Sequence, residues 1–581
     1  MRRRAIVAAV LALVGVLASC ARVPTSGPVR FEPMGTSSPG RTSIPVLVSG
    51  PDPGDSAQQV ARGFLDSMAS YQAGQPISRK YLAPSVAERW QPSGVFVYDS
   101  AVWPLSEPEP GRVLIDVPLV AHVGPGGAWT SAHPGERVKL DLGMTKVDGE
   151  WRISNPPDAL IMSTFNFNRE FAQHNLYFFD PNFEILVPDP VYLPIRGHLE
   201  TLLVNALLRG PSPWLRPAVQ SALPAGTRLA TPAVTVEDSV ARIDLTGDIA
   251  NLSDSQRRFI LAQLAWTLGQ VPGVRKVEVT SDRVSLGVED AGVRPESEKW
   301  PIYDPMVAGA ARGAYALSKG RLVILGPDRT VPVRGPLGQV DLDARSIAVS
   351  LFAERDVAQP REGDKPASAH WLATVSSDGT TVRVHSSAGE TRTVLQGTDI
   401  VEPSWDRTGQ LWMTDRRGGR ARILVRDLSE RLFQVAAPGL TGKDVRALKV
   451  SREGARVAAL VEESGRTNLY VGRIERGDAM NAIRGLRQIR VPLTSMTDLA
   501  WADLDRIVVL GREGESPARP TLVSVDGSQV EFLGSGPNAH ALAAAPGQPV
   551  LLAAEDGRLY VEHSDYRWAV RGEGTCPAYP G

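Results

Sequence analysis

Apolar residues recur with a helical period at the start of the first expected region, residues 52–168. Val60, Phe64 and Met68 stand at i, i+4 and i+8, so they share one face of a helix. Asp55, followed by Gln58 three residues later, is the expected N-cap of this helix. The pattern therefore predicts a helix that packs by one apolar face.

Later in the same region the apolar period changes to two, which is typical of a strand with one buried face. The alternating residues are Val138, Leu140, Leu142 and Met144. Asp148-Gly149 then turns the chain into Trp151 and Ile153, which predicts a hairpin with one face buried. Helices followed by a curved sheet ending in DGEWRI resemble the α+β fold of the nuclear-transport-factor-2-like superfamily. That fold carries both enzymes and inert binding modules, so it does not define a function.

The second expected region, residues 175–290, mixes both periods. Leu199 to Leu207 carry a helical stripe that stops at Gly210-Pro211, and Val240 to Leu245 read as a strand. Ser253 is the expected cap of a helix that reaches Leu268, and a last strand follows at 274–279. The motifs ALLRGP and SALPAGT, a strand ending in Asp-Leu and a final VxxVxV strand resemble the GerMN domain, which is also α+β.

The third expected region, residues 305–581, contains a repeat in which a turn precedes an apolar strand. The turns begin at Leu342, Trp405, Val450, Trp501 and Ala545, and the strands are IAVSL, QLWM, RVAAL, RIVVL and PVLLA. The last three steps are 45, 51 and 44 residues, and the first is 63 because it includes a polar insert at 354–366. Such a repeat predicts an all-β propeller of roughly six blades. A β-sandwich with chance similarity is the alternative.

The first twenty residues predict export and lipidation. Arg2 to Arg4 precede an apolar run from Ala5 to Ala18, which is too short for a membrane span but suits a signal peptide, residues 1–19. Leu17, Ala18, Ser19 and Cys20 match the bacterial lipobox, so Cys20 is the expected lipid acceptor. Acyl chains such as palmitate would then hold the protein on the extracytoplasmic face of the cell membrane. Residues 20–51 read as a flexible tether. A plain secretory signal is the alternative.

Composition and charge narrow the function further. Lys plus Arg number 63 and Asp plus Glu 64, a net charge of -1, which argues against nucleic acid as a partner. Two cysteines, Cys20 and Cys576, cannot build an all-cysteine zinc site, and no histidine has metal-ligand spacing. Ser404, Asp406, Gly409 and Trp412 approximate an Asp-box with one residue inserted, which we interpret as a blade corner fixed by Asp406. We therefore expect no enzyme activity, no cofactor and no metal.

The order of these parts resembles the actinobacterial lipoprotein LpqB family over nearly all of the chain that would follow Cys20. The resemblance rests on LASC at Leu17 to Cys20, on ALLRGP and SALPAGT, and on the WDRTG-type repeats. It implies an accessory role for the two-component system MtrAB, in which the lipoprotein engages the extracytoplasmic domain of the sensor kinase MtrB. It also implies support of cell-envelope homeostasis and division.

Two alternatives remain open at this point. A propeller hydrolase, such as a glycosidase or lactonase, requires paired carboxylates at the propeller axis. A peptidoglycan-binding or other glycan-binding lipoprotein predicts exposed tryptophans along a groove. Trp214 and Trp266 are candidate contact aromatics, although burial in the core is the commoner fate of tryptophan.

Overall fold

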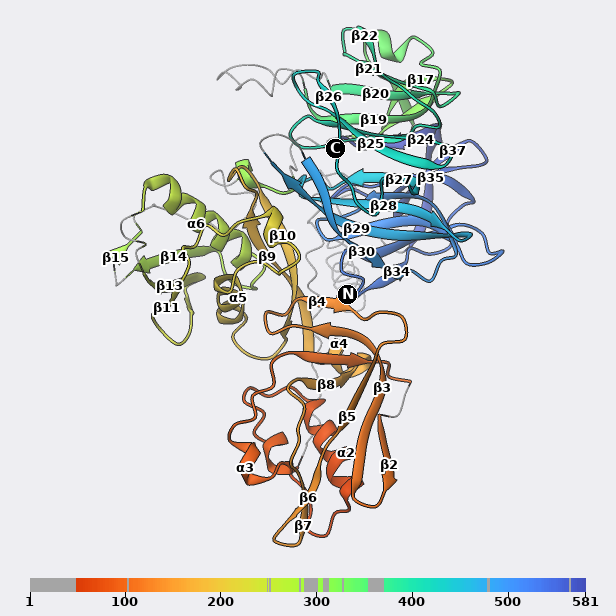
Figure 1. Cartoon of the computed structure of the whole chain (residues 1–581). Helices are drawn as coiled ribbons and strands as arrows, with labels where there is room; N and C mark the ends of the chain where they lie inside the picture. Colours follow the sequence, from red (N-terminus) through yellow and green to blue (C-terminus); the bar gives the residue numbers. More distant parts are fainter. Residues whose placement is uncertain are drawn as a thin grey trace, which may run out of the picture. The chain divides into compact units, whose positions relative to one another are not determined.

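The computed structural model describes residues 49–581, apart from 102–103, 248, 250–251, 282–283, 287–300, 307–312, 327–328, 354–369, 478–480 and 564–565 (Figure 1). All of these residues belong to one unit, 41–581. The predicted signal peptide, the lipobox, nearly all of the tether and the polar insert at 354–366 lie outside the described residues.

The first region opens with the expected helix, α2 (Ala57–Met68), which buries Val60, Phe64 and Met68. Its N-cap is Ser56 and not Asp55, so that prediction is wrong by one residue. The Ser56 hydroxyl accepts from the N–H of Gln59, while the Asp55 carboxylate accepts from the N–H of Asp52 in the preceding turn. Two short helical turns follow, η1 (Ser78–Tyr81) and α3 (Pro84–Ala87).

The helix packs on a six-stranded sheet whose main path runs β2-β3-β1-β8, with β4 and β5 also paired to β3. These strands are β1 (Val95–Tyr98), β2 (Leu105–Glu109), β3 (Arg112–Val123), β4 (Trp129–Ser131), β5 (Arg137–Asp141) and β8 (Leu160–Ser163). The expected hairpin is β6 (Met144–Val147) with β7 (Glu150–Ile153), joined by Asp148 and Gly149 at positive φ. Within this hairpin only Ile153 is buried, so its expected apolar face is smaller than the alternation predicted.

The second region is the expected α+β layer. A five-stranded sheet of order β11-β13-β14-β15, with β12 paired to β13, carries the parallel pair β13–β14. The helix α4 (Thr164–Glu170) follows β8 and leads from the first region into the second. The elements of the second region are β9 (Phe171–Phe179), β10 (Leu186–Pro194), α5 (Leu199–Leu208), η2 (Arg216–Ala218), β11 (Arg228–Leu229), β12 (Thr235–Glu237), β13 (Val240–Thr246), α6 (Asp254–Leu268), β14 (Lys276–Ser281) and β15 (Val284–Ser285). Ser253 caps α6 through a capping box with Gln256, as predicted.

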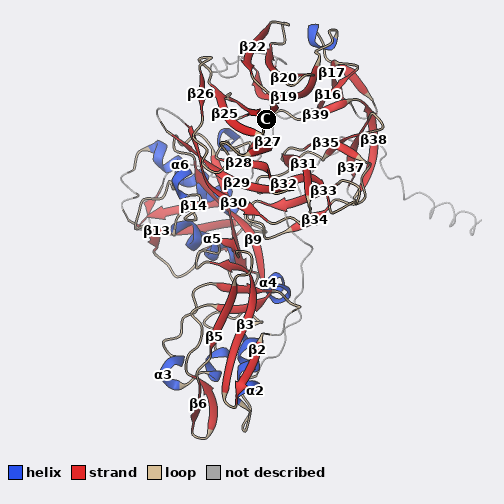
Figure 2. Cartoon of the chain, turned by 45° about the vertical axis from the view of Figure 1, so that its right-hand side comes forward, coloured by secondary structure: helices blue, strands red, loops and turns tan. Residues whose placement is uncertain are grey.

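The third region is built from strands (Figure 2), and the described residues form six four-stranded sheets. Two short turns precede the strands or lie among them, η3 (Pro301–Tyr303) and η4 (Pro336–Gly338). Blade 1 consists of β16 (Tyr315–Ser318), β17 (Arg321–Leu325), β18 (Thr330–Pro332) and β39 (Thr575–Ala578). Blade 2 consists of β19 (Ala344–Ala353), β20 (His370–Ser376), β21 (Thr381–His385) and β22 (Thr391–Gln396). Blade 3 consists of β23 (Val401–Trp405), β24 (Leu411–Arg417), β25 (Arg420–Arg426) and β26 (Leu432–Gln434).

The remaining blades follow in chain order. Blade 4 consists of β27 (Asp444–Val450), β28 (Arg456–Glu463), β29 (Arg466–Arg476) and β30 (Asn481–Ile489). Blade 5 consists of β31 (Ser495–Trp501), β32 (Arg506–Arg512), β33 (Arg519–Ser524) and β34 (Val530–Phe532). Blade 6 consists of β35 (Ala539–Ala543), β36 (Leu551–Ala554), β37 (Arg558–His563) and β38 (Arg567–Glu573). The propeller of roughly six blades is therefore confirmed.

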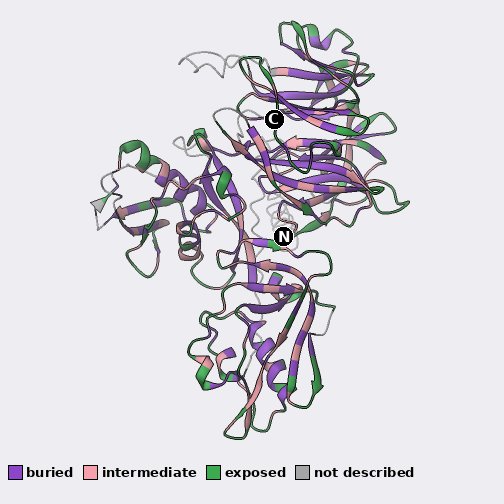
Figure 3. Cartoon of the chain, viewed as in Figure 1, coloured by how far each residue is buried: buried purple, intermediate pink, exposed green. Residues whose placement is uncertain are grey.

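The propeller is closed by strands from its two sequence ends. β39 pairs with β16, and Tyr315 stands opposite Ala578. The inner strands β39, β19, β23, β27, β31 and β35 contact one another in turn and complete a ring. Figure 3 shows how far these strands are buried. Apolar side chains between neighbouring blades form the cores, because each blade needs its neighbours to cover its faces.

The predicted equivalence of the five repeat motifs is wrong at one position. Four of the motifs form the turn before the second strand of a blade, namely before β24, β28, β32 and β36. The motif at Leu342 instead leads into β19, the first strand of blade 2. Inner strands are buried on both faces, so their sequence is as continuously apolar as that of the second strands.

Candidate functional site

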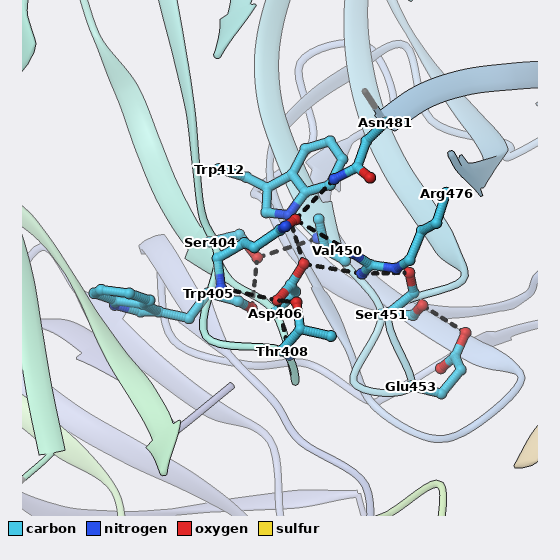
Figure 4. Close-up of polar contacts among 12 residues, drawn as sticks. Ser404, Trp405, Asp406, Thr408, Trp412, Val450, Ser451, Glu453, Arg476 and Asn481 are labelled. Carbon is cyan, nitrogen blue, oxygen red and sulfur yellow. Dashed lines mark hydrogen bonds and ion pairs between the residues drawn. The ribbon is translucent and has the colours of Figure 1, made fainter. Parts of the chain in front are cut away.

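The turn between β23 and β24 is organised by the carboxylate of Asp406 (Figure 4). Its Oδ1 accepts from the N–H of Thr408 at 2.9 Å, from the hydroxyl of Thr408 at 2.7 Å and from the N–H of Gln410 at 3.0 Å. Its Oδ2 accepts from Trp412 Nε1 at 2.9 Å. The interpretation of this motif as a blade corner fixed by Asp406 is confirmed.

The same carboxylate ties blade 3 to blade 4. Arg476, at the end of β29, donates from Nη2 to Asp406 Oδ2 at 2.9 Å and from Nη1 to Gln410 Oε1 at 3.2 Å. Asn481, at the start of β30, donates to the same Gln410 oxygen at 2.7 Å. Since Asp406 is 2% exposed, its charge is balanced by Arg476 and by hydrogen bonds and not by water. The cluster of Asp406, Gln410, Trp412, Arg476 and Asn481 therefore has a structural role.

A second cluster of charged side chains lies on three neighbouring inner strands. Glu402 on β23 forms an ion pair with Lys449 on β27, and Asp498 lies on β31. Both Asp498 oxygens accept backbone N–H groups at 2.8 Å, from Leu499 and from Leu542. The cavity beside Glu402 and Lys449 has a volume of about 50 Å³, which is room for water and not for a substrate.

Burial raises the pKa of the Asp498 carboxyl to about 7, and the negative charge of Glu402 adds to the rise. Lys449 and the two N–H donors lower the pKa and only partly offset the desolvation. The hydrolase alternative required paired carboxylates at the axis, and Glu402 with Asp498 are carboxylates on inner strands. Both are already bound, one to an ammonium group and the other to two backbone N–H groups, which is a structural arrangement.

The last residues of the sequence also line this cavity. Gly581 donates its N–H to the Val349 carbonyl at 3.0 Å. Arg452, 6% exposed, donates from Nη2 to the Pro580 carbonyl at 2.6 Å and from Nη1 to the Met306 carbonyl at 3.0 Å. Burial lowers the pKa of Arg452 to about 10. Arg452 therefore binds one residue that precedes the first strand of the propeller, Met306, and one that follows its last strand, Pro580.

Cys576, on β39, is a free cysteine that contacts the Arg345 carbonyl at 3.1 Å. Burial raises the pKa of its thiol to about 11, which keeps it protonated and unreactive near neutral pH. Cys20, the predicted lipid acceptor, lies outside the described residues together with Leu17, Ala18 and Ser19. Lipidation of Cys20 stays a prediction.

Two histidines, His174 in the second region and His385 in the propeller, serve packing. His385 contacts the hydroxyls of Thr374 and Thr391, one at each ring nitrogen and each at 2.9 Å. Burial lowers the pKa of both His174 and His385 to about 4, so they are neutral at physiological pH. Within the part of the chain that the structure describes, no group of three or more His, Cys, Asp or Glu side chains could hold a metal ion.

The tryptophans that the structure describes do not form the exposed groove that the glycan-binding alternative predicted. Among the ten tryptophans in the described ranges, six are buried and four are half-buried. Trp266 is packed in the core of the second region, as expected. Trp214 donates from Nε1 to the Gly485 carbonyl at 2.6 Å, and the Arg487 guanidinium lies 4.9 Å from its ring centroid. Both candidate contact aromatics, Trp214 and Trp266, therefore make their contacts with other residues of this chain.

A search of the described residues finds no helix that is long and apolar enough to cross a membrane.

Together these features define a class of protein, in which two α+β domains precede a six-bladed propeller. Three family descriptions match in the same order. They are "Lipoprotein LpqB, N-terminal domain" over residues 50–168, "Sporulation and spore germination" over 175–286 and "Lipoprotein LpqB beta-propeller domain" over 320–580.

Curated relatives match over nearly the whole length. The lipoprotein LpqB of Thermobifida fusca is 32% identical, with 97% of each chain covered. That of Streptomyces coelicolor is 30% identical, with 97% of this chain and 96% of the relative covered. Among solved structures, TolB from Acinetobacter baumannii is similar with a TM-score of 0.34 and 14% identity, covering 54% of this chain and 84% of that one. The chain belongs to the lipoprotein LpqB family.

Proposed function

We propose that this protein is a lipid-anchored accessory lipoprotein that regulates a two-component sensor kinase, MtrB, by contact with its extracytoplasmic domain. The observation that carries the proposal is the full-length match to lipoproteins LpqB, with all three domains in the same order. The identity of the kinase, MtrB, is inferred from the family resemblance alone. Support of cell-envelope homeostasis and division follows from the same resemblance.

Anchoring is part of the proposal because it makes a weak contact sufficient. A signal peptide that ends at Ser19 would leave Cys20 as the first residue, and acyl chains on Cys20 would hold it in the outer leaflet. A short flexible tether then gives an effective concentration of about millimolar against a partner in the same membrane. A contact of micromolar affinity is therefore enough.

Exposed apolar residues on blades 5, 6 and 1, which are consecutive, are candidates for such a contact. We call them the apolar rim, and they are Val530 and Phe532 on β34, Val570 on β38, Val331 on β18, Ile324 on β17 and Tyr566 in the turn before β38. The Tyr566 hydroxyl donates to Glu531 and Trp568 Nε1 donates to the Leu533 carbonyl, so the strands of blades 5 and 6 are joined here. Exposed apolar residues such as these favour a protein partner over water.

Regulation requires more than tight binding. A lipoprotein shifts a kinase between two signalling states only by as much as its affinity differs for those states. We therefore propose that the apolar rim packs on the sensor domain in one state better than in the other.

The test is a titration of the unlipidated chain, from Ala21 to Gly581, against the isolated sensor domain of the cognate kinase by calorimetry. We expect saturable binding with Kd of about 1 µM or tighter, which corresponds to roughly -8 kcal/mol. In reconstituted membranes, the same chain should change the rate of kinase autophosphorylation. Absence of binding at several hundred micromolar would overturn the proposal.

Substitutions locate the surface. Val331→Lys and Val570→Lys place a charge on edge strands, where lysine is well tolerated, and remove the apolar contact. Leu428→Lys is the matched control, because Leu428 is 57% exposed in blade 3 and lies outside the rim. We expect at least tenfold weaker binding for both rim variants and unchanged binding for the control. Equal effects of all three variants would exclude the rim as the contact surface.

A further inference from the structure

Blade 5 carries a cavity of about 340 Å³ that none of the structural roles above uses. Its lining residues are Asn168, Arg506, Leu522, Ser524, Ser528, Gln529, Val530 and Glu531. Seven of these eight residues belong to blade 5. The volume is at the lower end of the range of about 300–1,000 Å³ typical of ligand pockets, which selects a small ligand.

The cavity wall is fixed by the register of three neighbouring strands. Arg506 on β32 stands opposite Ser524 on β33, and Leu522 on β33 stands opposite Glu531 on β34. Ser524 also donates its N–H to the Gln529 carbonyl at 3.0 Å, which closes the turn before β34. Because these pairings are backbone hydrogen bonds of one sheet, the polar side chains are held in place before any ligand arrives.

The charged side chains of the cavity are only loosely engaged with each other. Arg506 Nη2 lies 3.4 Å from Gln529 Oε1, and Nη1 lies 3.7 Å from Glu531 Oε2. Both distances are longer than a well-formed charged hydrogen bond, which is about 2.7–2.9 Å. Arg506, Gln529 and Glu531 therefore keep hydrogen-bonding capacity for a ligand that offers both donors and acceptors.

A buried hydroxyl in the wall has no partner. Ser524 is 1% exposed, and its Oγ forms no hydrogen bond in the structure. A buried polar atom without a partner costs roughly 1–3 kcal/mol, so such an atom in a cavity wall calls for an explanation. Rotation of the Ser524 side chain toward the cavity would let a ligand hydroxyl satisfy this atom.

We infer that this cavity is a binding site for a neutral saccharide unit. A sugar ring offers hydroxyls that donate and accept at once, which matches Arg506, Gln529, Glu531 and Ser524 together. Leu522 supplies a small apolar surface that the C–H groups of a sugar ring can cover. No tryptophan lines the cavity, so recognition rests on hydrogen bonds from planar side chains.

The charges around the cavity disfavour an anionic ligand. Arg506 and Glu531 are the charged lining residues, and their charges cancel. Two further carboxylates lie next to lining residues, because Asp505 precedes Arg506 in the chain and Asp526 accepts from the N–H and the hydroxyl of Ser528. A phosphate or a carboxylate ligand would face this negative field, whereas a neutral sugar would not. This inference is independent of the kinase contact, since sugar binding can be measured without the kinase.

The test uses the unlipidated chain from Ala21 to Gly581 and two neutral probes by ligand-observed NMR. One probe is N,N'-diacetylchitobiose, which represents N-acetylated cell-wall sugars, and the other is trehalose, which represents unmodified hexoses. Saturable binding of either probe supports the site, and the stronger one identifies the source. Failure of both probes to bind at tens of millimolar would overturn the inference.

Variants tie the binding to this cavity. Gln529→Ala and Glu531→Ala remove hydrogen-bonding groups from the wall, and we expect each to weaken binding by at least tenfold. Gln434→Ala is the matched control, because Gln434 is an exposed glutamine on β26, the outer strand of blade 3. We expect the control to bind as the original chain does. Pocket variants that are folded and bind normally would contradict the site.

A second readout needs no substitution. A photoreactive derivative of the bound saccharide should label peptides from residues 519–532 after irradiation, and mass spectrometry identifies them. Labelling confined to other peptides would overturn the assignment, whatever the effect of the variants.

Discussion

Asp406 and Trp412 are joined by a hydrogen bond of 2.9 Å from the indole Nε1 to the carboxylate Oδ2, and both side chains are buried. The same oxygen accepts from Arg476 on the next blade. One carboxylate thus fixes the turn between β23 and β24, the core tryptophan of blade 3 and the junction with blade 4. This arrangement makes Asp406 a structural residue of the propeller.

We expect Asp406→Ala to destabilise the propeller strongly. The substitution leaves the half-buried Arg476 without its counter-ion and the buried Trp412 Nε1 without its acceptor. Arg476 keeps the Gln410 and Gly454 oxygens, so we expect a loss of about 2–4 kcal/mol, somewhat below the cost for a fully buried ion pair. Urea unfolding followed by tryptophan fluorescence measures the change in the free energy of unfolding.

Asp378→Ala is the control for this experiment. Asp378 forms the same kind of turn in blade 2, where it accepts from the N–H and hydroxyl of Thr380, but it is exposed. We expect a loss of about 1 kcal/mol or less for the control, because water replaces the lost bonds. Similar losses for the two variants would mean that burial and Arg476 add nothing to the role of Asp406.

Lipidation predicts a difference between the only two cysteines. Cys20→Ser should remove the acyl group, so the protein expressed in its own host moves from the detergent phase to the aqueous phase on phase separation. Cys576→Ser should stay in the detergent phase, since Cys576 is a half-buried thiol on β39 of the folded propeller. Intact mass spectrometry of both proteins gives the added mass. An unlipidated original chain would identify the leader as a plain secretory signal.

Sequence patterns predicted the features that depend on neighbours in the chain. Ser253 is predicted as a cap because it stands directly before an apolar helical pattern, and Gln256, which completes its capping box, is only three residues away. The corner at Asp406 is predicted from Ser404, Asp406, Gly409 and Trp412, and the groups that Asp406 binds in the turn, Thr408 and Gln410, are equally close in the chain. The cap of α2 was misplaced by one residue, since Asp55 and Ser56 are both good caps and the preceding turn uses Asp55.

Features that depend on strand register and on the closure of the propeller ring could not be predicted from the sequence. Glu402, Lys449 and Asp498 lie on three different blades and meet only because the inner strands form a ring. The cavity of blade 5 depends on Arg506 standing opposite Ser524, and a shift of one residue in that pairing would turn the side chains to the other face. No local motif encodes such a pairing.

Removal of the last three residues, Tyr579–Gly581, should destabilise the propeller. The Tyr579 hydroxyl donates to the Pro549 carbonyl at 2.8 Å, and the Pro580 carbonyl accepts from buried Arg452 at 2.6 Å. The truncation exposes the ring closure and leaves half of a buried guanidinium without its acceptor, which together cost about 2–5 kcal/mol. Thermal unfolding by circular dichroism gives the change.

Removal of Gly581 alone is the matched control for that truncation. It deletes the hydrogen bond to the Val349 carbonyl and keeps Tyr579 and Pro580, so we expect a loss of about 1 kcal/mol. An equally small loss for the longer truncation would show that Arg452 does not need the Pro580 carbonyl.

Asp498 should give the propeller a stability that falls as pH rises. Its pKa is about 7 in the folded chain and has the ordinary value, 3.8, once unfolded. Between these two values the folded chain holds the proton and the unfolded chain has lost it, so the free energy of unfolding decreases with rising pH and levels off above about pH 7. The charged groups that face Asp498 are Glu402, which adds to this effect, and Lys449, which opposes it.

The variant Asp498→Asn isolates this contribution, because the amide has the same shape and no proton to lose. His174 and His385, whose pKa values are lowered to about 4, lose stability as pH falls instead, and they act equally in both proteins. The difference in stability, variant minus original, should therefore increase from about pH 5 to about pH 8 by roughly 1–3 kcal/mol. Urea unfolding across this range measures the difference. A constant difference would show that Asp498 is ionised throughout, and a decreasing one would reverse the sign of its shift.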